Sequence, residues 1–106
     1  PWHIPRLMRR LRVSWARMKR LGESGSPCRR PLVALKKMCV FPMKETASQE
    51  ELMHLKIIST ALDENPIDER TLFMKLHSSL SKALFISNLI TMFELCVLKL
   101  MSLTIS

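Results

Sequence analysis

The chain has 106 residues, a net charge of +8 and a hydrophobic content of 47%. That hydrophobic content excludes a wholly disordered chain, and the length leaves room for one small domain at most. With eight Met, no Tyr and only two Gly, the composition favours helices over sheets.

Charge divides the chain unevenly. Residues 1–44 hold twelve Lys and Arg side chains against one acid, Glu23, a local charge of +11, so the rest of the chain carries −3. We predict a basic arm at residues 1–44 and a small helical segment at residues 45–106. We expect the arm to be too charged to contribute much core, so that residues 46–106 are the folding unit and benefit from a partner, an oligomer or a membrane.

Residues 5–21 are predicted to form a cationic amphipathic helix, with Pro5 in its first turn and Gly22 as its stop. The apolar residues fall within one arc of about 140°; they are Leu7, Met8, Leu11, Trp15, Met18 and Leu21. Basic residues occupy most of the remaining surface. Because like charges crowd this polar face, we expect the isolated helix to fray in water and to be ordered by an anionic surface.

The next two segments are harder to assign. Residues 22–31 have the Gly, Ser and Pro content of a turn and linker. Residues 32–41 form a short apolar run that Pro42 closes, and the pattern leaves both a short helix and a strand open.

A helical hairpin is predicted to follow. Ser48 and Glu51 form a capping box for a helix over residues 49–62. Asn65 and Pro66 have the residue types of an N-cap and a first helical position, so a second helix is predicted to start there. Its apolar face extends to Leu84, and the short connection favours an antiparallel hairpin that continues into an apolar C-terminal helix.

The last helix is predicted over residues 83–105, which is long enough to cross a bilayer. Glu94 and Lys99 interrupt it, and two such charges cost about 5–7 kcal/mol on insertion while the apolar residues return about 4–7 kcal/mol. The polar residues also gather on one side of the helix. A buried or interfacial helix is therefore favoured over a spanning one.

No catalytic or metal-binding motif is present, and we predict a protein without a catalytic site or a cofactor. The paired acids Glu50/Glu51, Asp63/Glu64 and Asp68/Glu69 stand at predicted helix ends, where they stabilise the helix dipole. His54 and His77 are expected at the surface. Three cysteines without a tight spacing give no disulfide framework, which favours a reducing compartment.

The basic arm is predicted to bind anions, either an anionic lipid surface or the phosphates of a nucleic acid. The predicted anion-binding residues are Arg6, Arg9, Arg10, Arg12, Arg17, Lys19, Arg20, Arg29 and Arg30. A membrane is favoured because the apolar tail supplies a second attachment signal. For nucleic acid, Trp2 and Trp15 could stack on bases.

Residues 83–106 could instead pack on a helix of a partner chain. The sequence does not define the compartment, since it is compatible with an intracellular, a mitochondrial or a membrane-associated protein.

Residues 17–37, RMKRLGESGSPCRRPLVALKK, resemble a string found in conceptual open reading frames antisense to LINE-type plant retroelement reverse transcriptases. The resemblance covers about a fifth of the chain and implies no fold, cofactor or catalytic residue. It implies a further hypothesis, that the reading frame is retroelement-derived and has no selected function. The capping signals that follow Ser48 weigh against that hypothesis.

Overall fold

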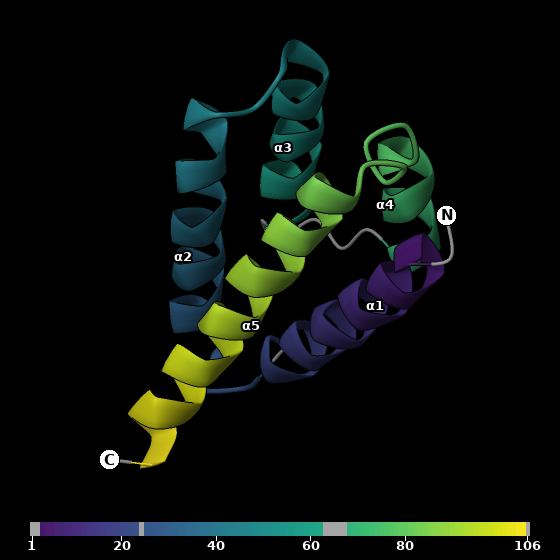
Figure 1. Ribbon diagram of the computed structural model, residues 1–106. Helices are drawn as coiled ribbons and strands as arrows, with labels where there is room; N and C mark the ends of the chain where they lie inside the picture. The colour runs from purple at the N-terminus through teal and green to yellow at the C-terminus, as the bar shows by residue number, and fades with distance from the viewer. Residues whose placement is uncertain (1–2, 24, 63–67, 106) are drawn as a thin grey trace.

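The structure, a computed structural model, describes residues 3–23, 25–62 and 68–105, and it confirms the predicted mostly-α class (Figure 1). The described residues contain helices and turns and no strand. In chain order the helices are α1 (His3–Leu21), α2 (Arg29–Val40), the 3₁₀ helix η1 (Phe41–Glu45), α3 (Gln49–Ala61), α4 (Glu69–Leu76) and α5 (Ala83–Ile105).

Helix α5 is the centre of the fold, and it has the bounds predicted for it. In Figure 1 it runs diagonally between α1 and α2, while α3 and α4 lie toward its first turns. Its buried residues recur every three or four positions, the spacing of one helix face; they include Ile86, Leu89, Ile90, Phe93, Val97 and Leu100. By length and composition alone, Ala83–Ser102 could also cross a membrane.

The basic arm contributes to the same core, contrary to expectation. Leu11 and Met18 of α1 are fully buried, and the ring of Trp15 lies 6.0 Å from that of Phe93 on α5. From α2, Leu32 is also fully buried. The arm reaches the core despite its charge because an amphipathic helix needs only one apolar face to pack, and α5 supplies the surface that covers it.

The linker between the first two helices is shorter than predicted, because the open segment 32–41 belongs to a helix that begins at Arg29. Pro31 is compatible with this start, since the backbone N–H groups of a first helical turn have no partner within the helix. The α-helix ends at Val40, before Pro42, and the chain continues as η1.

The predicted hairpin is present. The predicted cap of its first helix is confirmed, and its second helix starts later than predicted. The Oγ of Ser48 accepts a hydrogen bond from the Glu51 N–H at 3.2 Å, as the capping box predicts. Helix α4 begins at Glu69 with Asp68 as its N-cap; Asn65 and Pro66, the predicted start, lie outside the described residues.

Helix α4 is also shorter than its apolar pattern suggested. It ends at Leu76, and a turn over residues 77–82 separates it from α5. This turn contains three serines, whose hydroxyls compete with the helical backbone bonds. Within it, the Ser81 hydroxyl donates to the Ser78 carbonyl at 2.8 Å, so the polar segment HSSLSK ends the helix that the leucine spacing alone would extend.

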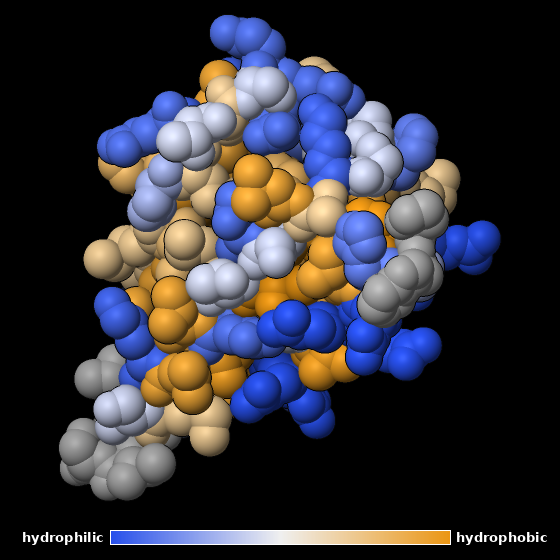
Figure 2. Space-filling view, in the orientation of Figure 1, coloured by the Kyte–Doolittle hydropathy of each residue, from blue (hydrophilic) through white to orange (hydrophobic). Residues whose placement is uncertain are grey.

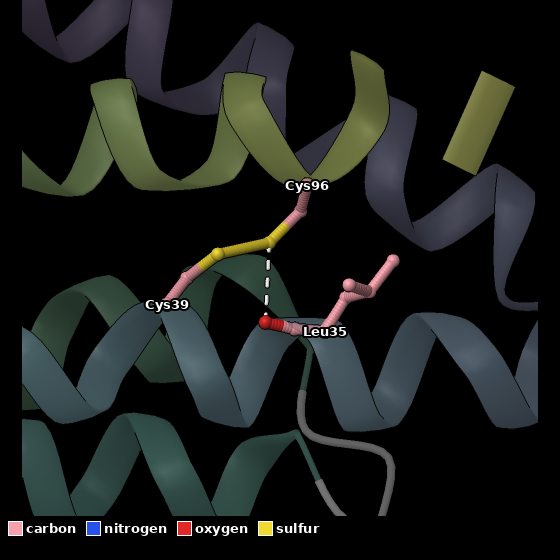
Figure 3. Close-up of a disulfide and its surroundings, with 3 residues drawn as sticks. All are labelled: Leu35, Cys39 and Cys96. Atoms are coloured by element: carbon pink, nitrogen blue, oxygen red, sulfur yellow. Dashed lines mark hydrogen bonds between the residues drawn. A yellow bond between two sulfur atoms is a disulfide. The ribbon is translucent and has the colours of Figure 1, made fainter. Parts of the chain in front are cut away.

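A disulfide joins Cys39 of α2 to Cys96 of α5 (Figure 3), although the cysteine spacing gave no disulfide framework and favoured a reducing compartment. The bonded residues are 57 positions apart in the sequence, and the backbone carbonyl of Leu35 lies 3.3 Å from the Cys96 sulfur. Cys28 is half-buried and outside any disulfide. The bond fastens α2 to the central helix, which spacing along the chain could not predict.

Candidate anion-binding surface

The nine predicted anion-binding residues do not form one cluster. Arg6, Arg10 and Arg17 follow one another at intervals of four and seven residues on α1, which places them in a single line along the helix. We call these three residues the arginine line. All three are exposed, and the guanidinium of Arg10 lies 3.5 Å from a carboxylate oxygen of Glu94 on α5. This contact places the arginine line at the border between α1 and α5 where Arg10 stands.

Two further cations of α1 turn toward α4 instead. Arg12 lies 3.5 Å from a carboxylate oxygen of Glu69, and its guanidinium sits 6.0 Å from the centre of the Phe73 ring. Lys19 faces the Asp68 carboxylate closely enough to help lower the pKa of that group, after the larger effect of the hydrogen bonds from Thr71. These cations meet acids of their own chain. Exposed pairs of this kind contribute about 0–1 kcal/mol each.

The remaining four predicted residues lie elsewhere. Arg9 and Arg20 are exposed on α1, and their spacing places them off the arginine line. Arg29 is half-buried and donates to the Gly22 carbonyl at 3.2 Å, so it closes the turn between α1 and α2. Arg30 is exposed in the first turn of α2. The basic arm is thus divided between several surfaces.

The outward side of α5 carries three exposed leucines among its polar residues. Leu84, Leu95 and Leu98 are exposed by 75%, 46% and 60%, and the exposed Thr91 lies between them. Their spacing places them on one side of the helix, opposite its buried face. We call Leu84, Leu95 and Leu98 the leucine stripe. Figure 2 shows hydrophobic residues interspersed with polar ones along the path of α5, and hydrophilic residues gathered beside it over α1.

One cation that the sequence did not single out is buried between α1 and α2. Lys36 is only 9% exposed, and its ammonium lies 5.7 Å from the centre of the Trp15 ring. Burial lowers the pKa of Lys36, and the charge of Arg29 lowers it further. Trp15 is itself 5% exposed, so it cannot stack on a nucleic-acid base as predicted; Trp2 lies outside the described residues. The indole N–H of Trp15 has no hydrogen-bond partner among the described residues.

The imidazole of His54 is buried, contrary to the expected surface position. Its Nδ1 is hydrogen-bonded to the hydroxyl of Ser79, and its Nε2 lies 3.5 Å from the hydroxyl of Ser78. The hydroxyl of Ser78 also lowers the pKa of Glu50 by hydrogen bonding, with a smaller contribution from Lys82. Ser79 is fully buried and Ser78 is exposed, and through both hydroxyls this cluster ties α3 to the 77–82 turn.

In the described parts of the chain, no group of three or more His, Cys, Asp or Glu side chains could hold a metal ion. Comparisons with protein-family models, curated protein sequences and solved structures find no match to this chain. The features of this chain that bear on its function are therefore those of its own surface, above all the arginine line and the leucine stripe.

Proposed function

We propose that this chain is a non-catalytic protein that binds anionic membrane surfaces from one side. The observation that carries the proposal is the pairing of the arginine line with the leucine stripe across the Arg10–Glu94 contact. The arginines bind lipid phosphates, and the exposed leucines enter the interface between head groups and acyl chains. Two such signals together give an attachment that one signal alone does not.

This surface differs from the one that the sequence suggested. The apolar face of α1 was expected to enter the membrane, but Leu11, Trp15 and Met18 pack against the rest of the protein. Helix α5 supplies exposed apolar residues in their place, while α1 supplies the charge. The surplus of positive charge along this face disfavours a second copy of the chain as its partner, because the two arginine lines would repel each other.

Vesicle binding of charge-reversal variants tests the arginine line. We expect the protein to co-sediment with phosphatidylglycerol-containing vesicles and not with pure phosphatidylcholine vesicles. Arg6→Glu with Arg17→Glu should weaken that binding by at least about tenfold, since each basic residue near an anionic surface contributes about 1 kcal/mol. Lys56→Glu with Lys75→Glu makes the same change in net charge on α3 and α4 and should have a much smaller effect. Equal losses in the two double variants would sink the assignment to this face.

A second pair of variants tests the leucine stripe. Leu95→Ser with Leu98→Ser should remove the part of vesicle binding that resists added salt, because screening weakens the arginines and leaves apolar insertion intact. The control is Met38→Ser with Met53→Ser, which changes two methionines exposed by 66% and 55% on α2 and α3. Salt-resistant binding that survives the leucine changes would contradict the proposal.

Nucleic-acid binding is the alternative that the arginine line also supports, since its guanidiniums could neutralise phosphates. It predicts affinity for RNA or duplex DNA that falls steeply with salt, is lost in Arg6→Glu with Arg17→Glu, and ignores Leu95→Ser with Leu98→Ser. Burial of Trp15 removes one stacking group from this alternative. A retroelement-derived frame without a selected function predicts specific binding to neither vesicles nor nucleic acid.

A further inference from the structure

A groove of 810 Å³ lies between α1 and α4, away from the arginine line. Its volume is within the range of about 300–1,000 Å³ typical of small-molecule sites in proteins. Along α4 and its N-cap the lining changes from charged at Asp68, Glu69 and Arg70 to apolar at Phe73 and Met74, and His77 follows in the turn after the helix. The groove therefore has a charged end and an apolar floor.

The floor of the groove is suited to a flexible chain. Met8 from α1 and Leu80 from the turn after α4 complete the apolar lining begun by Phe73 and Met74. Methionine side chains are unbranched and adapt to ligands of irregular shape. The eight residues of α4 span about 12 Å, comparable to an extended acyl chain of medium length.

The charged end has a surplus of cations. Arg12, Lys19 and Arg70 line the groove against two carboxylates, and both carboxylates are already engaged. Asp68 accepts hydrogen bonds from the backbone N–H and the hydroxyl of Thr71 at 2.8 and 3.0 Å, and Glu69 pairs with Arg12. Lys19 faces Asp68 as well, so the three cations exceed the two carboxylates by one charge, which we place at Arg70. The planar guanidinium of Arg70 matches a carboxylate with two parallel hydrogen bonds.

We propose that this groove binds the carboxylate of a medium-chain fatty acid, with the head group at Arg70 and the acyl chain over Met74 and Met8. The ligand matches the groove in both respects: an anionic head meets the surplus positive charge, and an apolar chain packs against Met74, which is 68% exposed. The site does not depend on the membrane surface, because the arginine line occupies a different side of α1.

The test is a titration of the full-length chain, labelled with ¹³C at its methionine methyl groups, with decanoate below its critical micelle concentration. We expect saturable shifts of the Met8 and Met74 methyl signals and none for Met38 or Met53, which lie outside the groove. Decyltrimethylammonium carries the same chain on a cationic head and should bind at least about tenfold more weakly. Equal binding of the two amphiphiles, or shifts without saturation, would overturn the proposal.

Matched variants distinguish binding in the groove from general effects of charge and polarity. Arg70→Glu should weaken decanoate binding by about tenfold or more, the loss of one charge-assisted contact, and Lys75→Glu on the same helix should not. Met74→Asp should have a similarly large effect, and Met38→Asp, at the comparably exposed Met38, should leave the affinity unchanged. Equal losses within either pair would contradict the site. Arg6→Glu with Arg17→Glu should keep full decanoate affinity, so failure of vesicle binding and failure of the groove remain distinguishable.

Discussion

Two basic helices, α1 and α2, flank the central helix α5, and they are attached to it in different ways. Helix α1 packs through Leu11, Trp15 and Met18 and keeps its arginines outside. Helix α2 places a lysine, Lys36, in its buried face and is joined to α5 by a disulfide.

The difference follows from how each sequence separates its charges. In α1 the basic residues avoid the positions that repeat with Leu11 and Met18, so one face stays apolar. In α2, Lys36 is four residues from both Leu32 and Val40, so the three share one face and are buried together. A helix with cleanly separated faces can attach by packing alone, whereas α2 combines an interrupted apolar face with a covalent bond.

Removing the disulfide should have the largest effect on the difference between α1 and α2. Cys39→Ser should lower the free energy of unfolding by about 4 kcal/mol, because the bond closes a long loop in the unfolded chain. The sequence separation of 57 residues sets that loop. Urea unfolding of both proteins in the absence of reductant measures the difference.

The matched control for that change is Cys28→Ser, which alters a half-buried cysteine outside any disulfide. It should change stability by less than about 0.5 kcal/mol. Hydrogen exchange should show that Cys39→Ser releases the amides of α2 more than those of α1. If α1 and α2 lost protection equally, α2 would depend on packing as much as α1 does.

A cavity created in the core beneath α1 should have the next largest effect on stability. Leu11→Ala should destabilise the protein by about 3 kcal/mol, since Leu11 is fully buried. Val13→Ala, at a side chain of the same helix that is 54% exposed, should stay within about 0.5 kcal/mol. Thermal unfolding monitored by circular dichroism compares the two. A small effect of Leu11→Ala would mean that α1 contributes little to the fold, as its charge alone suggested.

Much of the fold could be predicted because it is encoded locally. The Ser48 cap and the bounds of α5 depend on neighbouring residues and on helical spacing, and the structure confirms both. The failures are tertiary. Spacing along α1 identifies its apolar face but not what covers that face, and nothing near Cys39 in the sequence points to Cys96.

In the candidate surface, too, local features could be predicted from the sequence and tertiary contacts could not. Helical spacing was sufficient to place the arginines of α1 on its polar side. Whether an arginine turns toward α5 or toward α4 depends on acids far along the chain, Glu94 for Arg10 and Glu69 for Arg12. Burial of Lys36 had a local signal, its place between Leu32 and Val40, but the open choice between helix and strand for residues 32–41 concealed it.

Replacing the buried lysine should make α2 resemble α1, with the smallest effect of the three. Lys36→Met keeps an unbranched side chain of similar length in contact with Trp15 and removes the buried charge. We expect a gain of about 1 kcal/mol at pH 7, because exchanging a buried charge for a well-packed apolar group is often stabilising even though the contact between ammonium and indole is lost.

The pH dependence of stability identifies the cause of that gain. Burial lowers the pKa of Lys36 below the value of 10.5 that it has in the unfolded chain. Between the lowered value and 10.5 the unfolded state therefore binds more protons, so this group makes the free energy of unfolding rise with pH across that window. The cost of burying the charge is fully present below the window and is relieved above it. The advantage of Lys36→Met over the parent protein should accordingly be largest near neutral pH and shrink as the pH approaches 10.5. A constant advantage would show that packing, and not charge, distinguishes α2 from α1.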